Sequence, residues 1–161
     1  MRHLGSVITA MVTPFDDNLR VDLKRMAELT DYLIDLGSDG LLVTGTTGES
    51  PTLTNEEKVA LWETVVKAAR GRVPVMLGTG SNNTEQSIAL TKKAEEVGGD
   101  AILLVTPYYN KPPQNALFAH FRAVAAATKL PVMIYNVPGR TGRNIEAPTV
   151  ARLAHEGPNI V

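Results

Sequence analysis

The stretch Leu41-Leu42-Val43-Thr44-Gly45-Thr46-Thr47-Gly48-Glu49-Ser50 joins an apolar run to a loop of glycines and hydroxyl side chains. Residues 41–44 predict a buried strand, and Thr54 with Glu57 has the spacing of a helix capping box. The stretch therefore predicts a strand–loop–helix unit. Its uncovered N–H groups and hydroxyls suit an anion, but an ordinary turn uses the same residues, so both interpretations stay open.

The same strand-and-helix unit recurs about every thirty residues, the spacing of consecutive βα units. Short apolar runs predict buried parallel strands at residues 7–10, 41–44, 75–78, 101–105 and 132–135. Apolar residues at helical spacing predict helices over residues 23–36, 54–70, 84–97, 117–128 and 148–156. Asn159-Ile160-Val161 then predicts the beginning of a sixth strand.

Two α/β architectures fit this pattern, namely a doubly wound sheet of five strands and a (β/α)8 barrel. A complete domain seldom stops on the first residues of an apolar strand, because that strand's backbone groups would lack partners. We therefore expect residues 1–161 to be the N-terminal part of a single barrel domain, with five βα units and the start of strand six.

Composition excludes several classes of protein. The 161 residues are 43% hydrophobic and 20% charged, with a net charge of −1 and scattered basic residues, so no nucleic-acid partner is expected. No apolar run is long enough for a signal peptide or a membrane span, which predicts a cytoplasmic protein without a membrane partner. Cysteine is absent, and His3, His120 and His155 lie far apart, so no metal site is expected.

Polar side chains follow the predicted strands at their carboxyl ends, which meet on one face of a barrel. Tyr135 ends strand five, Tyr108 and Tyr109 follow strand four, and Thr46 follows strand two. Three tyrosine hydroxyls and a threonine at one mouth suit proton transfer, although a half-buried tyrosine often only fills a hydrogen bond. Arg140, on the loop after Tyr135, suits a carboxylate or simply solvent.

Three motifs together resemble the dihydrodipicolinate synthase family, also called 4-hydroxy-tetrahydrodipicolinate synthases. They are Gly45-Thr46-Thr47-Gly48-Glu49-Ser50, Pro107-Tyr108-Tyr109-Asn110-Lys111-Pro112 and Tyr135-Asn136-Val137-Pro138-Gly139-Arg140-Thr141-Gly142. The resemblance implies a (β/α)8 TIM barrel of class I aldolase type. It also implies condensation of pyruvate with L-aspartate 4-semialdehyde through a lysine Schiff base, without a cofactor, on the diaminopimelate route to lysine.

The resemblance also implies roles for individual residues. Tyr135 would give and take the proton of the bound keto acid, Thr46 would pass it on, and Tyr109 would complete the relay in a neighbouring subunit. The protein would accordingly be a homo-oligomer, a tight dimer that assembles further into a tetramer. Thr46 would also share the pyruvate carboxylate with Thr47, and Arg140 would receive the carboxylate of the aldehyde.

Two glycines of the first motif, Gly45 and Gly48, would let the loop backbone approach the substrate closely. The family's imine-forming lysine lies on strand six, in a run that begins like Asn159-Ile160-Val161. No lysine of this sequence stands at a predicted strand end, so we expect the 161 residues alone to be inactive.

The family's regulatory site for lysine is degenerate in this sequence. Residues that match Ser50, Asn82 and Tyr108 contact the inhibitor in lysine-sensitive members. Those members have a histidine and a carboxylate where this sequence has Lys58 and Gln86. A cation gained and an anion lost repel the ammonium group of lysine, which predicts weak or absent inhibition.

Other functions remain open at this point. N-acetylneuraminate lyases and 2-keto-3-deoxy sugar acid lyases share the glycine-threonine loop, but they generally lack the Tyr-Tyr-Asn and Gly-Arg-Thr-Gly pairing. A complete five-strand module that binds a phosphate-bearing ligand is a second alternative, although Gly78-Thr79-Gly80 is a weak phosphate motif. The third is a shortened barrel that serves as an inactive folding or assembly unit.

Overall fold

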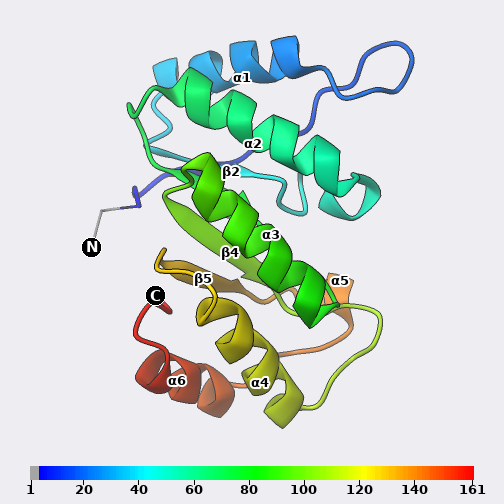
Figure 1. The fold of residues 1–161 in the computed structure, drawn as a ribbon, viewed down its shortest axis with the longest axis vertical. Coiled ribbons are helices and arrows are strands. Elements are labelled where there is room, and N and C mark those ends of the chain that lie inside the picture. Colours follow the sequence, from blue (N-terminus) through cyan, green and yellow to red (C-terminus); the bar gives the residue numbers. More distant parts are fainter. Residues whose placement is uncertain (1–3) are drawn as a thin grey trace.

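A computed structural model describes residues 4–161 as alternating strands and helices around one curved sheet (Figure 1). The strands are β1 (Ile8–Ala10), β2 (Gly40–Val43), β3 (Val75–Gly78), β4 (Ala101–Val105) and β5 (Val132–Tyr135). The helices are α1 (Leu23–Asp35), α2 (Asn55–Ala69), α3 (Thr84–Val97), α4 (Gln114–Ala125), α5 (Pro138–Thr141) and α6 (Ala147–Glu156), with a 3-10 turn η1 (Ser50–Thr52).

The five strands are all parallel and lie in the order β1-β2-β3-β4-β5, so each strand pairs with its neighbour in the sequence. A doubly wound sheet reverses its strand order at a switch point, and this sheet has none. The doubly wound alternative is therefore wrong. The structure is a half-barrel of five βα units, as the barrel prediction requires.

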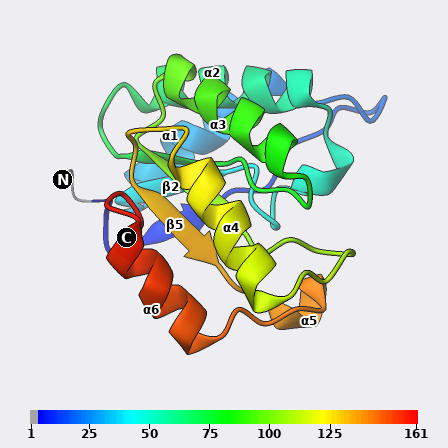
Figure 2. The ribbon, with the colours of Figure 1, turned by 60° about the horizontal axis from the view of Figure 1, so that its bottom comes forward.

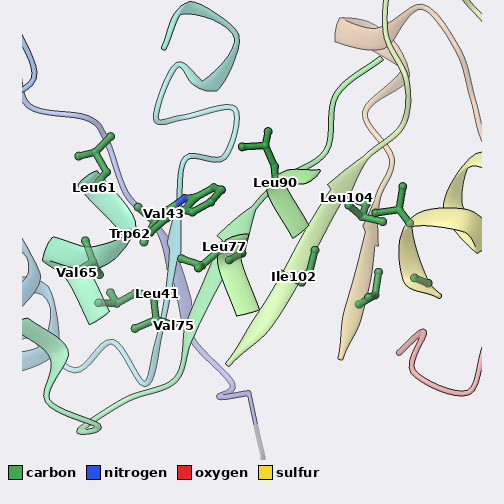
Figure 3. Close-up of a cluster of buried hydrophobic side chains, with 14 of the residues drawn as sticks. Leu41, Val43, Leu61, Trp62, Val65, Val75, Leu77, Leu90, Ile102 and Leu104 are labelled. Carbon is green, nitrogen blue, oxygen red and sulfur yellow. The ribbon is translucent and has the colours of Figure 1, made fainter. Parts of the chain in front are cut away.

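Residues alternate between the two faces of the sheet. One face packs on the helices, which lie along the outside of the sheet in Figures 1 and 2 and bury the main core, including Leu41, Leu77 and Leu104. Figure 3 shows this core where Trp62 and Leu61 of α2 pack between the helix and β2. The other face carries a smaller cluster that would face the barrel interior, with Met76, Ala101, Leu103 and the partly buried Tyr135 among its members.

Local sequence signals explain the helix ends. Thr54 and Glu57 form the expected capping box, because the Glu57 N–H donates to the Thr54 hydroxyl at 3.2 Å and the Thr54 N–H donates to the Glu57 carboxylate at 2.8 Å. Asn83 caps α3 with its side chain, which accepts from the N–H of Gln86 at 3.1 Å. Gly98 ends α3 with a φ of 91°, a conformation that glycine adopts without strain.

The structure corrects several element boundaries, and β1, for example, begins at Ile8 rather than at residue 7. Strand β2 ends at Val43, since Thr44 turns into the left-handed region with a φ of 53°. Residues 138–141, expected as loop, form the short helix α5, which starts with a proline and ends at Gly142. Helix α4 ends at Ala125, and Thr128 lies beyond it, where its hydroxyl donates to Glu95.

The expected sixth strand is confirmed at its first residues. Ile160 forms a parallel bridge with Val132, and two backbone hydrogen bonds, of 2.7 and 3.0 Å, join Val132 to Asn159 and Val161. The Asn159 side-chain amide donates to the carbonyls of Ala125, Thr128 and Leu130, which fixes the turn between α4 and β5. The chain after α6 therefore returns to the sheet beside β5.

Between residues 4 and 161, none of the helices is long and apolar enough to cross a bilayer. The same residues hold no group of histidine and carboxylate side chains arranged to bind a metal ion. His3 lies outside the described residues, and His120 is buried with its Nδ1 2.9 Å from the Thr84 hydroxyl.

Candidate active site

A cavity of about 260 Å³ opens at the carboxyl ends of β2 to β5, where the sequence predicted the chemistry to gather. The loop after β2, the ends of β3 and β4, and the segment from Tyr135 to α5 all contribute to its walls. The lining residues are Thr44, Gly45, Thr46, Ser50, Pro51, Gly78, Gly80, Leu103, Val105, Tyr108, Tyr135, Val137, Arg140 and Thr141. The lining combines apolar side chains with a few hydroxyls and one arginine, as in most small-molecule sites.

Several hydroxyls at the strand ends point away from this cavity and serve the fold. Thr79 and Thr91 share a hydrogen bond of 2.7 Å between β3 and α3, and both are buried. Thr13 donates to the carbonyl of Gly48 at 2.7 Å, which ties the end of β1 to the loop after β2. These hydroxyls are satisfied by protein groups, so they have a structural role.

Thr46, Tyr108 and Tyr135 differ from those residues. All three line the cavity, and their hydroxyls form no hydrogen bond with another group of residues 4–161. Burial raises the pKa of the Tyr108 phenol above its ordinary value of 10.0, so this group stays protonated at neutral pH. The cavity therefore presents these three hydroxyls, together with that of Ser50, to a ligand, although no hydrogen bond joins Tyr135 to Thr46.

Arg140 reaches the cavity from α5 rather than from an irregular loop. Pro138 starts this helical turn and Gly142, with a φ of 67°, ends it. A Cβ atom at position 142 would lie 2.8 Å from the Cε of Lys111, so the lysine packs directly over this glycine. Arg140 has no ion pair within residues 4–161, which leaves its guanidinium free for an anionic ligand.

Tyr109 lies outside this cavity. Its side chain is 90% exposed and its φ is 73°, so the backbone turns it away from Tyr108. Only two of the three expected tyrosines thus meet in one chain.

The remaining residues of the first motif have separate roles. Gly45 lines the cavity, whereas Thr47 is exposed and outside its lining. Gly48 is buried against the end of β1, where a Cβ atom would lie 3.0 Å from the Met11 carbonyl oxygen and 3.2 Å from the Thr13 hydroxyl. Gly48 therefore permits close packing of the loop on the chain after β1 rather than contact with the cavity.

The five residues expected at the degenerate lysine site divide into two groups. Ser50 and Tyr108 line the cavity. Asn82 accepts a hydrogen bond from the Asn110 side chain through its carbonyl, and the Gln86 amide donates to Asn55 at 3.3 Å.

Lys58, the last of these five residues, is 6% exposed, and its burial lowers the pKa of the ammonium group below the ordinary value of 10.5. No carboxylate of residues 4–161 pairs with it. Lys58 does not line the cavity, and neither does any other lysine of the described residues. Among the described residues, the cavity lining thus includes no lysine amine.

Two groups of lining residues were not predicted from the sequence. Leu103 and Val105 lie on the inner face of β4, and the period-two alternation of a strand is the signal that could have found them. Thr44 was expected as the last residue of a strand, and it instead lines the cavity in a left-handed conformation. No sequence signal announces that conformation, because threonine disfavours it.

Comparison with known proteins agrees with the fold and the motifs. The chain matches the profile of the dihydrodipicolinate synthetase family over residues 3–161. It is 59% identical over 159 residues to the 4-hydroxy-tetrahydrodipicolinate synthase of Bacillus subtilis. The aligned residues cover 99% of this chain and 55% of that protein.

Two solved structures extend the comparison. The dihydrodipicolinate synthase of Bacillus anthracis has 57% sequence identity and a TM-score of 0.97, over 100% of this chain and 55% of that one. The enzyme of Acinetobacter baumannii, described as chloride-inhibited and complexed with pyruvate, has 45% identity and a TM-score of 0.95, over 99% of this chain and 54% of that one. The chain spans about half the length of the relatives it matches, and it belongs to the dihydrodipicolinate synthetase family.

Proposed function

We propose that residues 1–161 are the N-terminal part of a 4-hydroxy-tetrahydrodipicolinate synthase, which condenses pyruvate with L-aspartate 4-semialdehyde. The observation that carries the proposal is one cavity lined by Thr46, Tyr108, Tyr135 and Arg140 in a chain of this family. The proteins that this chain matches carry that activity in their names or are complexed with pyruvate, which supports the choice of substrate.

In the proposed reaction, a lysine amine from outside residues 4–161 attacks the keto carbon of pyruvate and water leaves, giving an iminium ion. The positive nitrogen acidifies the methyl group, which loses a proton to form an enamine. The enamine carbon attacks the aldehyde carbon of the second substrate, which regenerates the iminium, and the new alkoxide takes a proton. The Tyr135 phenol supplies that proton, and Thr46 passes a replacement to it. The amine of the second substrate then displaces the lysine from the iminium carbon, which releases the product and the free lysine.

The anionic groups of the two substrates have separate partners in this proposal. Gly45 and Thr46 border the cavity and hold the pyruvate carboxylate through N–H and hydroxyl groups, with Thr47 beside them. Arg140, which has no ion pair within the described residues, binds the carboxylate of the aldehyde. Because the Arg140 guanidinium can pair with one carboxylate, it favours L-aspartate 4-semialdehyde as the acceptor over an uncharged sugar aldehyde.

Assembly completes the proton relay. Tyr109 is 90% exposed, and we infer that it enters the cavity of a second copy across a tight dimer interface, in an oligomer that extends to a tetramer. An exposed tyrosine with an amphipathic ring is typical of such interfaces. The relay would then run from Tyr135 through Thr46 to the partner's Tyr109.

Borohydride trapping tests the mechanism. The full reading frame that contains residues 1–161, incubated with pyruvate and borohydride, should gain one reduced pyruvate adduct on a lysine, as judged by mass spectrometry of peptides. Residues 1–161 expressed alone should gain none, since no lysine of residues 4–161 lines the cavity. A full-length protein without an adduct rules out the imine mechanism, and an adduct on the short chain rules out the external lysine.

Lysine inhibition tests the regulatory proposal. The full-length enzyme should keep its activity in sub-millimolar lysine, because Lys58 places a cation and Gln86 a neutral amide where the inhibitor's ammonium group would need an anion. The double variant Lys58→His and Gln86→Glu should gain inhibition relative to the unmodified enzyme in the same assay. Inhibition of the unmodified enzyme by sub-millimolar lysine contradicts the proposal.

A further inference from the structure

The indole of Trp62 contacts the loop that carries Thr46. Trp62 lies on α2, is fully buried, and its Nε1–H donates to the Thr44 hydroxyl at 2.8 Å. Figure 3 shows its ring beside Val43 at the end of β2. This hydrogen bond joins the helix layer to the first residue after the strand, two positions before Thr46.

Thr44 has an unusual backbone conformation for its residue type. Its φ is 53° and it is 3% exposed, in the left-handed region that a β-branched side chain rarely adopts. Its hydroxyl lies 2.7 Å from the Val43 carbonyl and 3.1 Å from the Gly78 carbonyl, both of which can accept from it. The hydroxyl therefore needs an external donor to fill its acceptor position, and Trp62 supplies the donor.

The direction of the loop depends on this turn. Thr44 and Gly45 both line the cavity, and Gly45 follows the left-handed residue directly. A change in the Thr44 dihedral angles would swing Gly45 and Thr46 as a unit, because they follow it in the chain. Thr46 has no side-chain hydrogen bond of its own within residues 4–161, so the backbone fixes its hydroxyl.

We propose that Trp62 is a positioning residue of the active site, which holds Thr44 in its left-handed conformation and so sets the place of the Thr46 hydroxyl. The expected effect of Trp62 on turnover rests on the proposed function. The expected effect of Trp62 on the order of the loop over residues 44–50 depends only on its hydrogen bond to Thr44.

The test uses the full-length protein with Trp62→Phe, which keeps an aromatic ring and removes the N–H donor. Because Thr46 and Gly45 are misplaced while the imine-forming amine is not, we expect kcat to fall about tenfold to a hundredfold and the KM for pyruvate to rise, while borohydride still traps pyruvate on the enzyme. The matched control is Phe121→Leu, which trims a fully buried aromatic side chain on α4 away from the cavity and should keep kcat.

Variants at Thr44 provide a second test of the same hydrogen bond. Thr44→Val removes the hydroxyl, and Thr44→Ser restores it, so the serine variant should recover most of the activity that the valine variant loses. The double variant Trp62→Phe with Thr44→Val should be no worse than Thr44→Val alone, because Thr44→Val already removes the hydroxyl that accepts from Trp62, along with its contacts to the Val43 and Gly78 carbonyls. Additive losses, or a Trp62→Phe enzyme with unchanged kcat, overturn the proposal.

Amide hydrogen exchange separates this inference from the proposed function. In Trp62→Phe the amides of residues 45–49 should exchange about tenfold faster, while Phe121→Leu should leave them unchanged. If the unmodified protein traps no pyruvate, the proposed function fails, and the exchange rates still decide the role of Trp62. Unchanged exchange at residues 45–49 overturns the role of Trp62 whatever the activity.

Discussion

The Tyr135→Phe variant of the full-length enzyme should turn over about two to four orders of magnitude more slowly than the unmodified enzyme, the range expected for loss of a general acid–base group. The phenylalanine ring fills the same space at the end of β5, so the cavity keeps its shape and loses only one hydroxyl. Steady-state kinetics with pyruvate and the aldehyde measure the effect, which should fall on kcat because the hydroxyl acts on the alkoxide rather than on substrate binding.

Tyr32→Phe is the matched control, since it removes a tyrosine hydroxyl from α1 where the side chain is 60% exposed and outside the cavity. Its kcat should equal that of the unmodified enzyme. Pyruvate trapping should persist in Tyr135→Phe, because the imine forms on a lysine. A kcat within tenfold of the unmodified value would contradict the general acid–base role and would show that Tyr135 only packs at the end of β5.

Gly78→Ala should destabilise the protein by about 3 kcal/mol, the upper end of the usual cost of overpacking. A Cβ atom at position 78 would overlap the carbonyl oxygen of Thr44 and lie 2.9 Å from its carbonyl carbon. Both are backbone atoms, so no side-chain rotation relieves the overlap. Strand β3 must then separate from the turn after β2, and denaturant unfolding should show a lower midpoint at a similar slope.

Gly139→Ala provides the control for this substitution. Position 139 lies within α5, and a Cβ atom there would have no heavy atom within 4 Å. Its free energy of unfolding should stay the same or rise by up to about 1 kcal/mol, because alanine restricts the unfolded chain. Equal stability of Gly78→Ala and Gly139→Ala would show that β2 and β3 are not held as closely as the structure places them.

The sequence predicted the strands well because each apolar run is bounded by turn residues. β3, β4 and β5 begin after Pro74, Asp100 and Pro131, and all three occupy the predicted residues. The capping box of α2 was predicted for the same local reason. A signal of this kind depends only on a few neighbouring residues, so it can be recognised in the sequence without knowledge of the tertiary structure.

Features fixed by tertiary contacts escaped the sequence analysis. Helix α5 has four residues with a proline and a glycine, too short for a helical period. The left-handed Thr44 is held by a side chain eighteen positions away. Tyr109 and Lys111 also have positive φ angles, which an irregular loop of non-glycine residues does not predict.

The site residues show the same contrast between positions that the sequence predicts and positions that depend on tertiary structure. Thr46, Tyr135 and Arg140 were predicted at one mouth because parallel strands bring their carboxyl ends together, and they line one cavity. Thr47 and Gly48 share the motif with Thr46, yet neither lines that cavity. Adjacent residues of a tight turn face different ways, and a motif does not state which of them faces the ligand.

The strand order has a consequence for synthesis on the ribosome. From β2 to β5, each strand pairs with the strand made just before it, and from α2 on, each long helix packs against the preceding long helix. A nascent chain can therefore add each βα unit to an edge that already exists, without waiting for a distant segment to emerge. Loop closure then spans only one unit at a time, so growth from the N-terminus has a low entropic barrier at each step.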